Sequence, residues 1–118
     1  MKKNIAIVGS RSFNDYDSMK EFILNRINLN EINKIISGGA IGADKLGERF
    51  SKEVLEQRPK VYKPNWVLYG KRAGMLRNTK IIEEADIVFV FWDGMSRGTA
   101  DSIGKAKRMN KELYIYRY

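Results

Sequence analysis

Three short stretches of this sequence carry small, hydroxylated and charged residues in the pattern of an anion-binding turn. The most informative, Ser37–Asp44, reads SGGAIGAD and lies between an apolar run at 34–36 and an amphipathic run at 45–55. Glycines lack the Cβ atoms that keep a ligand from the backbone, and the first N–H groups of a helix have no intrahelical partner. Such a turn can bind a phosphate, although a strand-to-helix turn that binds nothing has the same pattern.

The two other stretches also follow strand-like runs. Gly9-Ser10-Arg11 comes after the first apolar run, and Asp93–Thr99 comes after the strongly apolar run 86–92. Arg11 and Arg97 in these turns can each donate two parallel hydrogen bonds to a phosphate or a carboxylate. A shared ligand site therefore requires a fold that brings the three turns together.

The order of strand-like and helix-like runs predicts such a fold. Strands are expected at about 4–8, 34–36, 60–63, 86–92 and 112–116, the 60–63 run being short and polar like an edge strand. Helices are expected from Asp15 or Asp17 to beyond Ile27, at 45–55, at 71–84, and from Thr99 to about Met109. This strict alternation predicts an α/β protein with a Rossmann-like, doubly wound parallel sheet of five strands in the order 3-2-1-4-5.

In a sheet of this order, ligands bind beyond the carboxyl ends of the strands, where the winding reverses. That point lies between the first and fourth strands, with the second strand beside the first, so the three turns converge on it. The helix at 71–84 adds an arginine and an asparagine. The expected ligand-binding residues are Gly9, Ser10, Arg11, Ser37, Gly38, Gly39, Asp44, Arg77, Asn78, Asp93, Gly94, Ser96, Arg97, Gly98 and Thr99.

Composition limits the chemistry. The 118 residues are expected to form one domain, 1–118, and they include neither cysteine nor histidine, which excludes disulfides and thiolate metal sites. We expect no metal and no cofactor, because the dinucleotide fingerprint and the ATPase P-loop are both missing from the turns. The start of the chain leads directly into a strand and no apolar run has the length of a membrane span, so we expect a cytoplasmic protein without a membrane partner.

The basic residues are unevenly distributed. The formal net charge is +8, and between Arg58 and Lys80 there are seven basic residues and no acidic one. Tyr62, Trp66 and Tyr69 are interleaved among them, and such aromatic side chains serve either in a core, in an interface or as stacking platforms for bases. On the helix that follows, spacing predicts that Arg77 faces the ligand pocket while Lys71 and Arg72 are solvated.

The motifs together resemble one known family. They read G-S-R-x-F after the first strand, S-G-G-A-x-G-A-D after the second, A-G-M-L-R-N on the third helix, and A-D-I-V-F-V-F-W-D-G-x-S-R-G-T at the fourth strand. This combination, spanning about residues 4–106, resembles the YspA-related single-domain branch of the SLOG superfamily, which joins the LOG phosphoribohydrolases with the DNA-processing protein DprA.

The resemblance implies a Rossmann-like fold with a pocket for a nucleotide or a nucleotide-derived molecule. It also implies a role in sensing a nucleotide signal in conflict systems of bacteria and phages. The residues that it marks are Gly9, Ser10, Arg11, Gly38, Gly39, Asp44, Arg77, Asn78, Gly94, Gly98 and Thr99. One departure concerns catalysis: the phosphoribohydrolases carry P-G-G-x-G-T-x-x-E, and Ser102 stands here in place of their glutamate.

Three functions remain open, and we favour the first. It is the binding of a nucleotide-derived (phosphoribosyl) small molecule by a sensor or sequestering module, with a homo-oligomer left open. The second is a phosphoribohydrolase-like enzyme that cleaves nucleoside monophosphates, using Asp44, Asp93 or Asp101 together with Arg77. The third is single-stranded nucleic-acid binding by the basic, aromatic stretch from Arg58 to Lys80.

Overall fold

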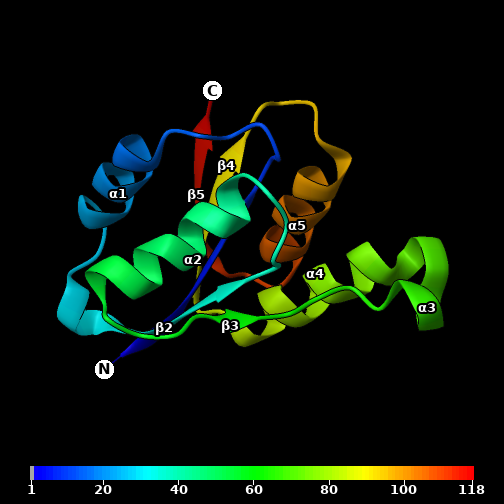
Figure 1. Ribbon diagram of the computed structural model, residues 1–118, viewed down its shortest axis with the longest axis horizontal. Coiled ribbons are helices and arrows are strands. Elements are labelled where there is room, and N and C mark those ends of the chain that lie inside the picture. Colours follow the sequence, from blue (N-terminus) through cyan, green and yellow to red (C-terminus); the bar gives the residue numbers. More distant parts are fainter. Residues whose placement is uncertain (1) are drawn as a thin grey trace.

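The computed structural model describes residues 2–118, which form one parallel sheet with helices on both faces (Figure 1). The strands are β1 (Lys3–Gly9), β2 (Ile32–Ser37), β3 (Lys60–Val61), β4 (Ile87–Trp92) and β5 (Glu112–Arg117). Their order is β3-β2-β1-β4-β5, and every neighbouring pair is parallel. The predicted Rossmann-like sheet, with the C-terminal strand at one edge, is confirmed.

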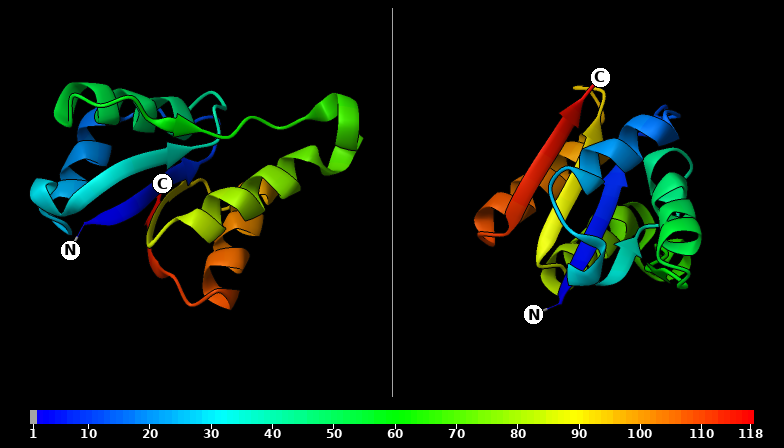
Figure 2. Two further views of the ribbon diagram at one scale, coloured as in Figure 1. Left: turned by 90° about the horizontal axis from the view of Figure 1, so that it is seen from below. Right: turned by 90° about the vertical axis from the view of Figure 1, so that its left-hand side faces the viewer.

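Helices cover the sheet in two layers (Figure 2). Their bounds are α1 Tyr16–Leu24, α2 Ala43–Val54, α3 Trp66–Tyr69, α4 Ala73–Glu84 and α5 Arg97–Arg108, with single 3₁₀ turns at Leu29–Glu31 and Gly70–Arg72. Side chains of α1 and α2 pack on one face of the sheet, in a core that contains Met19, Ile23 and Phe50. Side chains of α4 and α5 pack on the other face, around Ile82 and Ile103.

Burial on both faces explains the unbroken apolar runs of the central strands. Along β1, Ile5 and Ile7 point into the α1–α2 core, whereas Ala6 and Val8 point into the α4–α5 core. Successive side chains of a strand point to opposite faces, so a strand that is covered on both sides must be apolar at every position. None of the helices within residues 2–118 has the length and apolar character needed to cross a membrane.

Three boundaries differ from the sequence prediction. Helix α1 begins as expected, with Asp15 accepting a hydrogen bond from the Ser18 N–H, but it ends at Leu24 rather than beyond Ile27. Strand β3 is two residues long because β2, with which it pairs, ends at Ser37 where the glycine turn begins. No partner strand remains beyond that point to extend the ladder.

The third difference is a projecting segment before α4. The helix predicted from 71 begins at Ala73, and the separate short helix α3 precedes it. Gly70, with φ +56°, breaks the two apart in a conformation that favours glycine. We call residues 64–76 the arm, because it extends away from the sheet (Figure 2, left).

Candidate functional site

A cavity of about 300 Å³ lies at the carboxyl ends of the central strands, between the first turns of α2 and α5. This is the point where the winding of the sheet reverses, the usual ligand position in such folds. Its lining residues are Val8, Gly9, Arg11, Ala40, Asp44, Arg77, Asn78, Ser96, Gly98, Thr99 and Ser102. The turns after β1, β2 and β4 therefore meet at one place, as the sequence predicts.

Eight of the fifteen expected site residues line this cavity: Gly9, Arg11, Asp44, Arg77, Asn78, Ser96, Gly98 and Thr99. Sequence reasoning missed three lining residues, Val8, Ala40 and Ser102. Ser102 had a usable signal, since it follows Gly98 by four residues on α5 and therefore lies on the same face of that helix. As predicted, Lys71 and Arg72 are exposed to solvent.

Ser10 was expected to contact the ligand but instead joins four elements. It is almost fully buried, and its N–H donates to the Phe91 carbonyl of β4 at 2.8 Å. Its carbonyl accepts from the Ala43 N–H of α2 at 3.2 Å, while its hydroxyl accepts from the Asp93 N–H and lies 3.4 Å from the Thr99 hydroxyl. Ser10 thus fixes the turns that build the cavity.

The residues of the glycine turn, 37–44, also form hydrogen bonds within the protein. Ser37 is fully buried and donates its hydroxyl hydrogen to the Asp44 carbonyl at 3.0 Å. The Gly38 carbonyl accepts from the Arg77 guanidinium, and a Cβ at Gly38 would lie 2.6 Å from the Asp44 carboxylate. Gly39, at φ +77°, turns the chain without lining the cavity. The turn therefore holds Asp44 and Arg77 in place.

Asp44 accepts hydrogen bonds from two backbone N–H groups of the cavity lining. One carboxylate oxygen accepts from the Gly9 N–H at 3.2 Å, and the other accepts from the Ala40 N–H at 3.3 Å. Burial raises the pKa of Asp44 to about 6, although Arg77 and the backbone N–H groups act in the opposite direction. A phosphate in this cavity must therefore find other donors.

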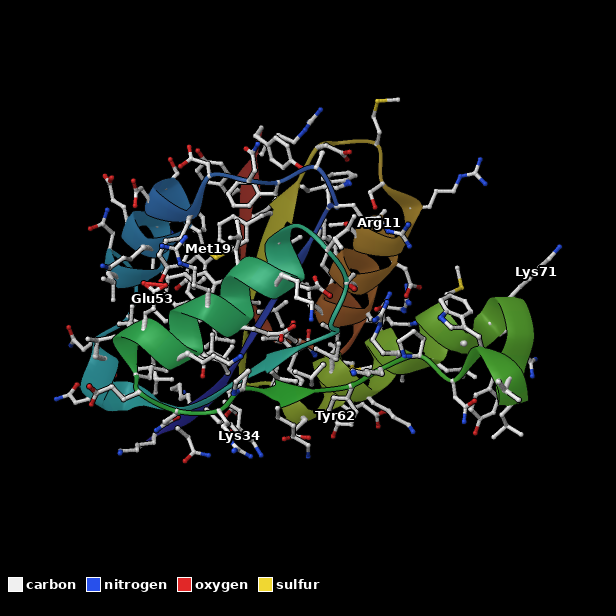
Figure 3. All side chains as sticks on the ribbon, in the orientation of Figure 1. Arg11, Met19, Lys34, Glu53, Tyr62 and Lys71 are labelled. Atoms are coloured by element: carbon white, nitrogen blue, oxygen red, sulfur yellow. The ribbon has the colours of Figure 1, made fainter. Side chains whose placement is uncertain are left out.

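Two arginines supply such donors. Arg77 is held by Asn78, whose Oδ1 accepts from Nε at 2.9 Å, and by the Gly38 carbonyl. Burial lowers the pKa of Arg77, Asp44 opposes that shift, and the nearby charge of Arg11 adds to it. Arg11 is exposed and has no hydrogen-bond or ion-pair partner among residues 2–118; it reaches toward α5 (Figure 3). Asp44 offsets the charge of Arg77, so Arg11 supplies the uncompensated positive charge that favours an anion in this cavity.

The first turn of α5 supplies further donors. Ser96 caps the helix by accepting from the Thr99 N–H at 3.3 Å and from the Thr99 hydroxyl at 3.0 Å. The N–H groups of Arg97 and Gly98 have no intrahelical partner, because they come before the first helical hydrogen bond. A Cβ at Gly98 would meet no atom within 4 Å, so the approach to this turn is open.

Three predicted residues of the turn after β4 lie outside the cavity lining. Asp93 accepts hydrogen bonds from the Met95 and Ser96 N–H groups, at 2.9 and 2.8 Å, and these bonds lower its pKa. Gly94, at φ +84°, leaves the room that the Arg117 guanidinium fills. Arg97 is exposed.

The carboxylates proposed for hydrolysis are all engaged. Asp101 lies outside the cavity lining, forms an ion pair with Lys105 at 2.7 Å and accepts from Asn78 at 3.2 Å. Asp93 stabilises its own turn, and both oxygens of Asp44 accept backbone hydrogen bonds. Ser102, the residue in the glutamate position, faces the cavity with a hydroxyl that donates to the Gly98 carbonyl.

Burial of Asp44 predicts a pH-dependent stability. Since its pKa rises from an ordinary 3.8 to about 6 on folding, the stability associated with its protonated form is complete below pH 3.8 and is lost as the pH rises through 6. This rise in the pKa of Asp44 corresponds to a change of about 3 kcal/mol in the free energy of unfolding between the two pH limits. Urea unfolding between pH 4 and 6.5 should show this decline, and Asp44→Asn should remove it. A carboxyl carbon of Asp44 that titrates near pH 4 by NMR would contradict it.

A phage protein and a bacterial DNA-processing protein are similar to this chain, whereas no protein-family model matches it. The Gene 61 protein of Mycobacterium phage D29 is 27% identical over 112 residues, in a match that covers 90% of each chain. DNA processing protein A from Helicobacter pylori, solved to describe its single-stranded DNA binding mode, matches 95% of this chain with a TM-score of 0.72 and 20% identity.

The structural match establishes the class of fold, the Rossmann-like α/β fold of DNA processing protein A. The present chain spans 64% of the length of that protein chain. The superfamily that the sequence motifs resemble includes DNA processing protein A, so structure and motifs agree at the level of the fold.

Proposed function

We propose that the chain binds single-stranded DNA, holding the phosphate of one nucleotide in the cavity at the carboxyl edge of the sheet. The observation that carries this proposal is the position of Arg11, which lines the cavity without an internal partner in residues 2–118, facing the open first turn of α5. A charged donor and unpaired backbone N–H groups that converge on one space are suited to a phosphate.

Two further observations favour a polymer as the source of that phosphate. The formal charge of +8 includes seven basic residues between Arg58 and Lys80, and Arg77 of this stretch lines the cavity. DNA processing protein A, whose fold this chain shares, is described by its single-stranded DNA binding mode. We propose binding without cleavage, because Asp44, Asp93 and Asp101 are all held by internal hydrogen bonds.

The size of the cavity favours a second candidate, a nucleotide-derived small molecule. At about 300 Å³, it lies at the lower end of the range for small-molecule pockets. The YspA-related branch, which the motifs resemble, implies such a ligand, with the domain 1–118 acting as a sensor or sequestering module. Both candidates share a nucleotide phosphate at Arg11, so they are separated by ligand length.

Fluorescence anisotropy of a labelled oligo(dT) at 50–300 mM salt tests the proposal. Each phosphate contact to a single strand contributes about −0.7 to the slope of log K against log salt concentration, so two or more contacts give a slope of about −1.4 or steeper. Full competition by equimolar dTMP would favour the small-molecule candidate, and absence of binding to either would refute both.

A separate assay examines cleavage. Protein incubated with nucleoside monophosphates and with oligo(dT) is expected to release no free base, as followed by liquid chromatography. Release of base that is lost in Asp44→Asn or Asp101→Asn would instead identify a hydrolase and the carboxylate that it uses.

A further inference from the structure

Trp66 begins α3 and lies in the open on the arm. Its side chain belongs to neither core, and 55% of the residue is exposed. The ring rests on α4 at Gly74, where a Cβ would lie 3.6 Å from Cη2 of the indole. The edge of the indole therefore lies against α4 at Gly74, at a distance that would also accommodate a Cβ, while 55% of the residue stays exposed to solvent and available to a partner.

The indole approaches α4 about one helical turn away from the cavity lining. Gly74 and Asn78 are four residues apart on this helix, so they share one face and are separated by slightly more than one turn, roughly 6 Å along the axis. Asn78 lines the cavity, and Arg77 beside it does so as well. A ligand that leaves the cavity along this face of α4 reaches Trp66 after about one helical turn.

The charge around Trp66 indicates which partner it fits. Lys63, Lys71, Arg72 and Lys80 are exposed on the arm and its flanks, and no acidic residue occurs between Arg58 and Lys80. A second copy that docked arm to arm would bring the same positive charge to this surface and would be repelled. Exposed aromatic rings among basic side chains are the combination that binds single-stranded nucleic acid, through stacking and phosphate attraction.

We propose that Trp66 stacks on the base of the nucleotide next to the one whose phosphate occupies the cavity. The site then selects an oligonucleotide of at least two nucleotides over a mononucleotide. This inference rests on the proposed function, since it assumes a nucleotide phosphate at Arg11, and it adds a second subsite for the adjoining base.

The test compares dTMP with the 5′-phosphorylated dinucleotide d(pTpT) by isothermal titration calorimetry. Stacking of one base contributes roughly a tenfold gain in affinity, so the wild type should bind the dinucleotide about ten times more tightly than dTMP. Trp66→Ala should remove that ratio and leave dTMP binding within about twofold, whereas Trp66→Phe should keep most of it. Val67→Ala, which alters the fully exposed neighbour, is the matched control and should change neither affinity.

Intrinsic fluorescence supplies a second readout. Stacking should quench the emission of the wild type when d(pTpT) is added, and this change should be missing in Trp66→Phe, which retains Trp92. If dTMP binds but the dinucleotide gains nothing, the stacking subsite is refuted while the phosphate site stands. If neither ligand binds, the proposed function fails as well. An unchanged ratio in Trp66→Ala, together with altered self-association or loss of a protein partner, would overturn stacking and make the arm a protein interface.

Discussion

Arg11→Ala is expected to weaken the binding of oligo(dT) by about ten- to a hundredfold. A hydrogen bond between a charged donor and a phosphate contributes roughly 1.5–3 kcal/mol, and 1.4 kcal/mol corresponds to a factor of ten. Arg11 is exposed and is not bonded to another side chain within residues 2–118, so its removal should leave the fold intact. Anisotropy titrations at constant ionic strength measure the loss, and thermal unfolding of the free variant checks the fold.

Arg108→Ala is the matched control, because it removes the same charge from the opposite end of α5. Its affinity for oligo(dT) should stay within about twofold of the wild type. A distant surface charge contributes only a long-range electrostatic attraction, which salt screens. Equal losses in the two variants would mean that binding follows net charge and that Arg11 makes no specific contact. In that case the cavity would lose its assigned role.

Gly42→Ala should destabilise the protein by about 2 kcal/mol or more. Gly42 precedes α2 with φ +85° and ψ −131°, a backbone conformation that is almost restricted to glycine. A Cβ there would also lie 2.5 Å from the carbonyl oxygens of Ser10 and Arg11, a distance so short that the backbone of the β1 turn would have to shift. For a chain of this length the melting temperature should fall by roughly 8 °C, as measured by circular dichroism.

Gly98→Ala should change ligand binding without lowering the stability of the fold. A methyl group at Gly98 meets no atom within 4 Å, and alanine is favoured over glycine in a helix, so the melting temperature should stay level or rise slightly. Because Gly98 lines the cavity, the added methyl group should also weaken phosphate binding. A Gly42→Ala protein that melts within 1 °C of the wild type would show that the close approach of the β1 and α2 turns is wrong.

The sheet could be predicted because burial leaves a direct record in the sequence. Strands β1 and β4 are covered on both faces, so every residue from Ile87 to Phe91 is apolar and the run is unmistakable. The arm has no comparable pattern in the sequence. Helix α3 has four residues, contributes nothing to either core and ends at a positive-φ glycine, so neither periodicity nor burial marks it.

The place of the cavity could be predicted from the sequence, but the contacts of the residues around it could not. Convergence of three turns follows from strand order alone, and the cavity lies where they meet. Whether a hydroxyl faces a ligand or joins two turns depends on contacts between residues far apart in the chain. The sequence indicates that Ser10 and Ser37 contact a ligand. In the structure, the Ser10 hydroxyl accepts from the Asp93 N–H, and the Ser37 hydroxyl donates to the Asp44 carbonyl. The hydrogen bonds from backbone N–H groups to Asp44 likewise could not be predicted from the sequence.

The position of Ser10 has a consequence for how the protein moves. The Ser10 N–H donates to the Phe91 carbonyl, and Ser10 accepts from the N–H groups of Ala43 and Asp93. These three hydrogen bonds connect β1, α2 and β4 as one unit. These amide hydrogens should exchange with solvent only when the whole protein unfolds, whereas those of the arm should exchange by local opening. A nucleic-acid strand that binds would therefore meet a rigid site for its phosphate and an arm that can adjust to its bases.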